Sequence, residues 1–430
     1  MSKQKIPVSL NLNIRGLKPS ATLRINEQCA EMVQAGKKVY RFGFGQSPFP
    51  VPVTVVEKLK VHAHEKDYLP VRGLWQLRDA VAQYHSKQAG IPLSGEDVLI
   101  GPGSKELMFL LQMVYYGDII IPRPSWVSYA PQARIASRQV YWLSTKMKNG
   151  YLLHPDELEN FCRNDHGQPR LLILNYPSNP TGATYPEKQL KKMAQVARRH
   201  NVVVLSDEIY GELHHQGQHR SIATYYPEGT IISSGLSKWC GAGGWRLGTF
   251  TFPSGLRWLL NGMAVAASET FTSTSAPIQY AATRAFLGGK DIDDYLLNSR
   301  FILKTIAREV SQKLTSAGIV HPAPEGGFYL FPVFGEFKEK MQKRGIQTSE
   351  ELCTRLLNET GVALLPASDF GFPPEYLAAR LSYVDFDGEV ALKLAGRLKE
   401  NELSTSSQLA EKLAPKVVEG IERMTEWLAG

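Results

Sequence analysis

Short apolar runs alternate with helical patterns through the middle of the chain. Five β-branched or leucine-rich runs are predicted strands, at 97–100, 117–122, 170–177, 201–208 and 229–234. Two helical patterns lie between them, at 105–116 and 187–200. Short apolar runs separated by helices indicate βαβ units, and continuous apolar runs indicate strands buried on both faces. We therefore predict an α/β fold with a mainly parallel mixed sheet.

The pattern changes after about residue 310, where strand-like runs at 326–334, 361–366 and 379–384 stand among helical patterns. This mixture of short strands and helices predicts a smaller α+β domain. A chain of 430 residues is too long for one ordinary core.

Three segments are expected from these changes. They are an N-terminal segment (1–60) that packs with the small domain, a large domain (61–309) and a small C-terminal domain (310–430). In the last of these, a polar linker after residue 400 is expected to lead into an amphipathic helix.

Composition excludes several classes of protein. Hydrophobic content of 43% and charged content of 21% are typical of a soluble globular protein. The net charge of +8 is spread along the chain, without the basic run of a nucleic-acid arm. No apolar run reaches the roughly 18 residues of a membrane span, and the first residues lack an apolar stretch of signal-peptide length.

The four cysteines stand far apart without a CxxC pair, which argues against a disulfide framework and a zinc site. Reduced thiols and a cytoplasmic location are expected, with no metal site.

Polar residues of unusual chemistry lie at or just beyond the carboxyl ends of four of the predicted strands. They are Ser104, Asn179, Asp207 and Lys238. Because ligands of parallel α/β sheets bind beyond the carboxyl ends of the strands, we expect one site that contains all four residues.

Each motif alone leaves an alternative open. The glycines of "GPGSKE" (101–106) suit a phosphate at a helix N-terminus, although an ordinary capped turn fits as well. In "NYPSNPTG" (175–182), Asn179 could donate to an anionic oxygen or belong to a structural loop. In "SDEIY" (206–210), Asp207 requires a cationic or hydrogen-bonding partner, or it caps the following turn.

The stretch "SSGLSKWCGAGGWRLGTF" (233–250) places Lys238 among small polar residues, eight positions before Arg246. A lysine and an arginine separated by glycines suggest an anion held near an amine.

In this order and spacing the motifs resemble those of the fold type I pyridoxal-phosphate (PLP) aminotransferases of class I. The resemblance is carried by "GSK", "NPTG", "SDEIY", "SK…GGWRLG" and the late "ARLSY", and it extends from 15–23 to about residue 398. It implies a homodimeric enzyme that transfers an amino group from an L-amino acid to a 2-oxo acid such as 2-oxoglutarate, by a ping-pong mechanism.

The resemblance implies a role for each residue around the cofactor ring. Lys238 forms the Schiff base with the PLP aldehyde and later moves the proton, and Asp207 pairs with the pyridine nitrogen. Asn179 and Tyr210 hydrogen-bond the 3-oxygen of the ring, and Trp126 stacks on it.

The phosphate would be held by one turn and two further side chains, with Ser234 as an additional candidate. These residues are Gly103, Ser104, Lys105, Ser237 and Arg246. Tyr68 matches a tyrosine that reaches the phosphate in the neighbouring subunit.

The substrate would be held from the other side of the cavity. Arg380 matches the arginine that binds the substrate α-carboxylate, with Asn179 and the backbone near Gly45 beside it. Lys105 or Arg72 could select a distal carboxylate. Aspartate or an aromatic amino acid is favoured as donor.

The chain departs from the family pattern at two places. The loop at 45–50 reads "GQSPFP" instead of "GEPDF", so closure over the site could differ. Gly235 stands where a serine is common, so one phosphate hydroxyl is absent or is supplied by Ser237.

Two other functions compete with transamination. A PLP-dependent lyase or synthase, such as a C–S lyase, would use the same lysine. A PLP-binding regulator would need a helix-turn-helix, for which the N-terminus has no room. We interpret "LHHQGQHR" (213–220) as a solvated loop rather than a metal site, and "GGFYLFP" (326–332) as core of the small domain.

Overall fold

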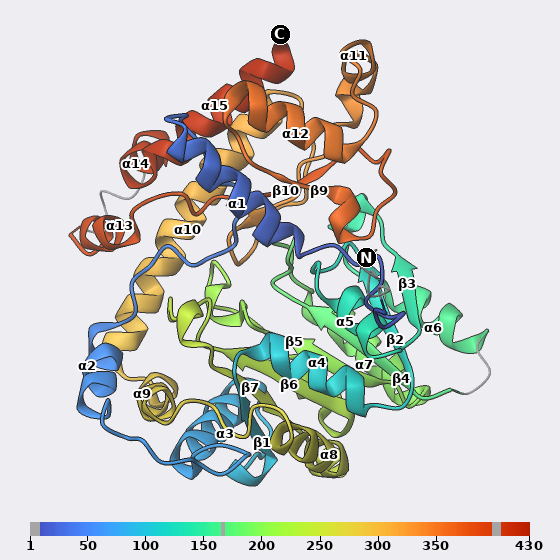
Figure 1. Cartoon of the computed structure of the whole chain (residues 1–430), viewed down its shortest axis with the longest axis vertical. Coiled ribbons are helices and arrows are strands. Elements are labelled where there is room, and N and C mark those ends of the chain that lie inside the picture. The colour runs from blue at the N-terminus through green and yellow to red at the C-terminus, as the bar shows by residue number, and fades with distance from the viewer. Residues whose placement is uncertain (1–8, 165–167, 398–405) are drawn as a thin grey trace, which may run out of the picture.

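A seven-stranded mixed sheet forms the centre of the larger part of the molecule (Figure 1). The structure is a computed structural model, and it describes residues 9–164, 168–397 and 406–430. The strand order is β1-β7-β6-β5-β4-β2-β3. The strands are β1 (Val98–Gly101), β2 (Asp118–Arg123), β3 (Val140–Ser144), β4 (Arg170–Asn175), β5 (Val203–Asp207), β6 (Thr230–Gly235) and β7 (Gly248–Thr251). Strands β2 to β6 run parallel, whereas β7 is antiparallel to both of its neighbours, which confirms the predicted mainly parallel mixed sheet.

Both faces of this sheet are buried because alternate residues of each strand pack against different helices. In β4, Leu171 and Ile173 join an apolar cluster with α4 (Ser104–Val114), α5 (Tyr129–Ile135) and α8 (Arg257–Ser268). Leu172 and Leu174 join a second cluster, with α6 (Pro155–Arg163) and α7 (Glu187–Arg199). This two-sided burial explains why the strands read as continuous apolar runs.

A second, antiparallel sheet of three short strands lies in the upper part of Figure 1. Its order is β8-β10-β9, with β8 (Tyr329–Leu330), β9 (Leu365–Pro366) and β10 (Ala379–Ser382). The helices in this part are α11 (Lys338–Lys343), α12 (Ser349–Thr360), α13 (Gly388–Ala395), α14 (Ser406–Leu413) and α15 (Pro415–Ala429). The predicted C-terminal linker falls largely on residues 398–405, which lie outside the described residues, and two helices follow it instead of one.

The N-terminal segment divides between the two sheets. Helix α1 (Ala21–Gln34) packs near β9, and Tyr40 forms a β-bridge with Val362. Helix α2 (Val53–Val61) instead packs on α9 (Ala276–Leu287), which also packs on α3 (Trp75–Ala89).

The long helix α10 (Lys290–Ser316) runs from the lower to the upper part of the molecule and crosses the expected boundary at residue 310 (Figure 1). The division of the chain at residues 60 and 309 stays a prediction.

Two strands of the large sheet were not predicted. β3 lies at the sheet edge and is only partly buried, although its sequence "VYWLS" begins with four apolar residues. β7 is four residues long, and three residues separate it from the glycine-rich turn at 241–244. Because β7 reverses direction between β1 and β6, it brings Gly248 beside the start of α4.

Candidate active site

A cavity of about 330 Å³ lies at the carboxyl ends of the parallel strands. Side chains from both sheets and from the N-terminal segment line it. Of the predicted site residues, it brings together Gly45, Ser104, Lys105, Trp126, Asn179, Asp207, Tyr210, Ser237, Lys238, Arg246 and Arg380.

Lys238 follows β6 and directs its amine into this cavity. Its Nζ donates to the carbonyl oxygen of Gly45 at 2.6 Å. Burial lowers the pKa of Lys238 from 10.5 to about 8, and the positive charges of Arg380 and Arg246 act in the same direction, while Asp207 opposes them. A primary amine with such a pKa is partly neutral near physiological pH, and a neutral amine is a nucleophile and a base.

Asp207 is the last residue of β5 and is 3% exposed. Its carboxylate accepts hydrogen bonds from Tyr129 Oη at 2.5 Å and from Ser233 Oγ at 3.3 Å. Burial raises the pKa of Asp207 to about 6, although these hydrogen bonds oppose the rise. A cation beside the carboxyl group would therefore be needed to keep it fully ionised.

One end of the cavity is shaped to hold an anion. Gly103, at φ 92°, precedes α4, whose first amides have no intrahelical acceptor and no side-chain cap. A Cβ on Gly103 would lie 2.2 Å from Arg246 Nη2, and a Cβ on Gly248 would lie 2.1 Å from the nitrogen of Ser104. The two glycines thus allow Arg246 and the helix N-terminus to approach one point, where a phosphate would be stabilised.

At the opposite side, Arg380 of β10 is a buried cation, 1% exposed. Its Nη1 donates to Asn179 Oδ1 at 3.1 Å and its Nη2 donates to the carbonyl oxygen of Gly43 at 2.7 Å. Among the described residues, its Nε has no hydrogen-bond partner, and no acidic side chain forms an ion pair with the guanidinium. Since a buried charge requires a counter-charge, this geometry suits a carboxylate ligand.

Aromatic rings complete the cavity wall. Trp126 packs edge-on against Tyr129 with ring centroids 5.2 Å apart, and the Lys105 amine lies 5.6 Å from the Trp126 ring. The hydroxyls of Tyr210 and Tyr329 lie 2.9 Å apart, and Tyr329 stacks under Arg380 at 4.7 Å.

Four sequence-predicted residues do not line the cavity. Gly103 lies beside Arg246 just before α4, and Ser234 lies buried within β6. Tyr68 is 89% exposed on the surface. The guanidinium of Arg72 is held by Glu96 and Asn261, so within this chain Lys105, and not Arg72, lies at the cavity.

One interpretation of the sequence was wrong. The loop at 213–220 is not simply solvated, since His214 and His215 are both 8% exposed and His219 Nε2 lies 2.9 Å from the Glu208 carboxylate. Within the described residues, no group of three or more His, Cys, Asp or Glu side chains could hold a metal ion.

The segment 326–332 is core, as expected, but it also serves the cavity. Phe328, Leu330 and Phe331 are fully buried, and Tyr329 points to the cavity beside Tyr210.

The site also contains residues that no sequence motif singled out, because their positions depend on packing. Tyr129 belongs to the same "RPSWVSY" stretch as Trp126, and that stretch was its only signal. Ser20, Thr22 and Leu23, at the start of α1, also line the cavity, and they belong to the segment 15–23 where the family resemblance begins.

The helices of the described chain include none that combines the length and the apolar character needed to cross a membrane.

A seven-stranded mixed sheet with its binding cavity at the strand ends, built on an amine and a buried carboxylate, is the architecture of the fold type I PLP-dependent transferases. The family model for aminotransferase class I and II matches residues 37–391, and the chain belongs to this family.

Curated relatives are similar over most of their length. The chain is 32% identical to the aspartate aminotransferase of Geobacillus stearothermophilus over 387 residues, covering 87% of this chain and 94% of the relative. It is 28% identical to the aspartate/prephenate aminotransferase of Thermus thermophilus, covering 87% and 94% of the two chains.

Among solved structures, the aspartate aminotransferase from Thermus thermophilus with maleate superposes with a TM-score of 0.83 at 26% identity, covering 98% of this chain and 100% of that one. The chain is therefore an aminotransferase that acts on amino acids and oxo acids.

Proposed function

We propose that this aminotransferase carries PLP on Lys238 and takes a dicarboxylic amino acid, aspartate, as its donor, with 2-oxoglutarate as acceptor. The observation that carries the proposal is the buried guanidinium of Arg380, which has an unpartnered Nε and faces the same cavity as the Lys238 amine. A substrate carboxylate would supply the missing counter-charge within reach of a base.

The residues present fit the cofactor. The glycine-lined approach of Arg246 to the start of α4 suits its phosphate, and Ser237 adds a hydroxyl at the same end of the cavity. Asp207, whose pKa burial raises to about 6, is suited to a protonated ring nitrogen that keeps it ionised. When bound, PLP supplies the aldehyde that receives the amino group and the ring that withdraws electrons from the substrate Cα.

The chain's own residues then bind, orient and move a proton. Trp126 would stack on the ring, while the Asn179 amide and the Tyr210 hydroxyl would bind its 3-oxygen. Arg380 holds the α-carboxylate, and the Nζ of Lys238 removes the proton from Cα. The lowered pKa of Lys238 suits this task because a base works best when its pKa is near the operating pH.

The distal carboxylate of aspartate would meet Lys105 at the cavity. The Lys105 amine lies over the outer wall formed by Trp126, and burial together with Arg246 lowers its pKa. The relatives named aspartate aminotransferase, and the neighbour solved with the dicarboxylate maleate, support this substrate class. An aromatic donor is the second candidate, because Trp126 and Leu23 also line the cavity.

We further propose a homodimer in which Tyr68 completes the phosphate site of the neighbouring subunit. Tyr68 is 89% exposed and makes no contribution to the cavity of its own chain. A cytoplasmic location stays an expectation from the wide spacing of the cysteines.

The test is a donor panel on the purified protein loaded with PLP. With aspartate and 2-oxoglutarate we expect equal amounts of oxaloacetate and glutamate, at a higher kcat/KM than with phenylalanine or alanine. Preference for phenylalanine would replace the dicarboxylate proposal by the aromatic one. Release of ammonia without glutamate would contradict transamination and support a lyase.

A further inference from the structure

Glu208 is a buried carboxylate for which the proposed chemistry has no use. It follows Asp207 directly, and it is 6% exposed. Removing a carboxylate from water costs several kcal/mol unless charged or hydrogen-bonding groups compensate for the lost hydration. The groups around Glu208 must therefore compensate for the lost hydration of this charge.

Three side chains donate to the Glu208 carboxylate. Ser206 Oγ and Ser221 Oγ lie 2.7 Å and 2.5 Å from Oε1, and His219 Nε2 lies 2.9 Å from Oε2. Because an ionised carboxylate only accepts hydrogen bonds, Nε2 of His219 must carry the proton. Although burial acts to raise the pKa of Glu208, His219 and the two serines hold it below its usual value. The carboxylate therefore stays charged.

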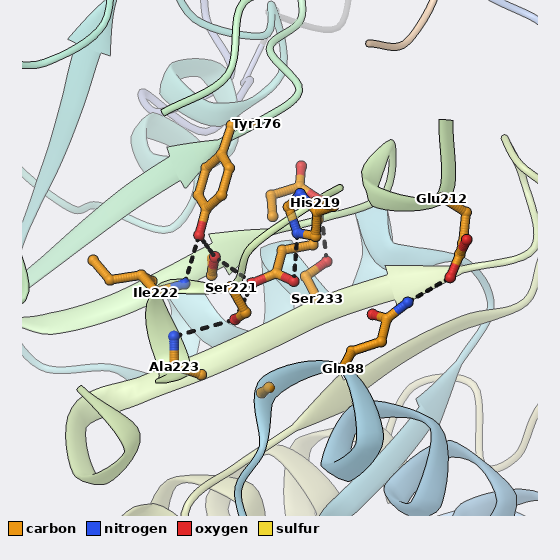
Figure 2. A network of polar contacts seen from close by, with 12 residues as sticks. Gln88, Tyr176, Glu212, His219, Ser221, Ile222, Ala223 and Ser233 are labelled. Carbon is orange, nitrogen blue, oxygen red and sulfur yellow. Dashed lines mark hydrogen bonds and ion pairs between the residues drawn. The ribbon is translucent and has the colours of Figure 1, made fainter. Parts of the chain in front are cut away.

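Tyr176 extends this arrangement to the next strand. Its hydroxyl lies 3.0 Å from Ser206 Oγ and accepts the amide of Ile222 at 2.8 Å. Figure 2 shows Tyr176, His219 and Ser221 converging beside the central sheet. The end of β5, the residue after β4 and the loop at 219–222 are thus tied together, and we call Ser206, His219 and Ser221 the Glu208 clamp.

The clamp acts on the segment that carries two proposed cofactor contacts. The amide of Glu208 donates to the carbonyl oxygen of Ser233 at 2.9 Å, and the carbonyl oxygen of Asp207 accepts from Asn175 Nδ2 at 2.9 Å. The backbone is held there on both sides, while the Glu208 side chain anchors it to the loop. Asp207 stands one residue before this anchor and Tyr210 two residues after it.

We propose that Glu208 is a positioning residue for the cofactor: its clamped carboxylate fixes segment 207–210, so that the Asp207 carboxylate and the Tyr210 hydroxyl face the bound ring in one orientation. The inference rests on the proposed function, since it concerns how the chain presents these two groups to PLP. At metal sites, outer contacts of this kind change affinity or activity by about tenfold to a hundredfold, and we expect an effect of this size on PLP binding.

The test compares Glu208→Gln with Glu212→Gln. Glu212 is a matched control because it lies in the same loop, and its side chain is 11% exposed in an ion pair with Arg300. Its other contacts lead away from Asp207 to Tyr84 and Gln88, the latter also drawn in Figure 2. Either substitution removes one buried charge, so we expect similar losses of thermal stability.

PLP binding separates the two variants. The dissociation constant is measured on cofactor-free protein by quenching of tryptophan fluorescence, and the absorption maximum of the bound cofactor is recorded. We expect Glu208→Gln to weaken binding by about tenfold or more and to shift the maximum, and Glu212→Gln to stay within about twofold of the wild type. Unchanged binding in Glu208→Gln, or an equal loss in Glu212→Gln, would overturn the inference.

A second pair keeps the inference testable if Glu208→Gln does not fold. His219→Gln retains an N–H donor for the Glu208 carboxylate, whereas His219→Leu removes it. We expect His219→Leu to weaken PLP binding about fivefold or more and His219→Gln to restore it to within about twofold of the wild type. Equal affinities in the two variants would contradict a role for the clamp. Failure of the wild-type protein to bind PLP would instead refute the proposed function itself.

Discussion

Replacing Lys238 by methionine should stabilise the cofactor-free protein below pH 8. The amine of Lys238 sits against the Gly45 carbonyl in a cavity that also contains the charges of Arg380 and Arg246. Burial and those two charges lower its pKa from 10.5 to about 8. The folded protein therefore destabilises the protonated amine relative to the neutral amine. Methionine keeps a similar unbranched chain without the charge.

The magnitude follows from proton linkage. A fall from 10.5 to about 8 in the Lys238 pKa, at 1.36 kcal/mol per pH unit, corresponds to at most about 3 kcal/mol of destabilisation by the protonated amine. Below pH 8 both the folded and the unfolded chain bind the proton, and this cost is fully present. Between pH 8 and 10.5 the unfolded chain binds more protons than the folded one, so the wild type gains stability as pH rises.

The variant also loses the hydrogen bond to Gly45, which reduces its added stability by about 1 kcal/mol. This loss does not change the direction in which the stability difference varies with pH. The assay is urea unfolding of cofactor-free wild type and Lys238→Met at several pH values from 7 to 10.5. We expect the advantage of the variant to be largest at pH 7 and to shrink as pH rises above 8.

Lys290→Met is the control, because Lys290 is 88% exposed in an ion pair with Asp294, which raises its pKa. It should give no stabilisation at any of these pH values. A difference between wild type and Lys238→Met that stays constant from pH 7 to 10.5 would refute the argument that the amine is destabilised in its charged form.

Three further predictions concern binding. Arg380→Leu should raise the KM for aspartate about a hundredfold, since two charge-assisted hydrogen bonds to the substrate carboxylate are lost. The dissociation constant of PLP should stay within about twofold of the wild type. Steady-state kinetics and fluorescence titration measure the two constants, and an unchanged KM would contradict the role of Arg380. Gly248→Ala should weaken PLP binding by about tenfold or more, because the new Cβ would lie 2.1 Å from the Ser104 nitrogen and would displace the first turn of α4; a variant that binds PLP like the wild type would show that no phosphate sits there. Lys105→Ala should lower kcat/KM for aspartate about tenfold while leaving that for alanine unchanged, and equal losses with both donors would exclude Lys105 as the group that reads the distal carboxylate.

Much of the large sheet was predictable because strands buried on both faces produce continuous apolar runs. β4 and β5 lie within predicted runs, and β2 and β6 each extend one residue beyond theirs. β7 was not predicted because "GTFT" is short and lies close to a glycine-rich turn. Its direction depends on pairing with β1, which is distant in sequence. Periodicity describes one segment at a time and does not encode which strands pair.

The same distinction separates the predicted and the missed parts of the site. Asp207 and Lys238 could be placed together because parallel strands share a carboxyl edge. Tyr329 reaches Tyr210 from the small sheet, so their contact depends on how distant segments pack.

Polar composition also misled at the histidine loop. His215 is buried because the carbonyl oxygen of Gly327 and the hydroxyl of Tyr383 lie near its Nε2 at 3.3 Å, and the amide of His215 donates to the carbonyl oxygen of Glu325. A polar residue can be buried when partners from elsewhere in the chain satisfy it, and local sequence gives no sign of such partners.

The central claim is that one amine, that of Lys238, binds the cofactor aldehyde covalently. The most direct measurement is to load the protein with PLP, reduce it with borohydride, digest it and locate the modified residue by mass spectrometry. The account predicts one stoichiometric modification, on Lys238, that is absent in Lys238→Met. A stable modification on another lysine, or none while Lys238 remains free, would contradict it.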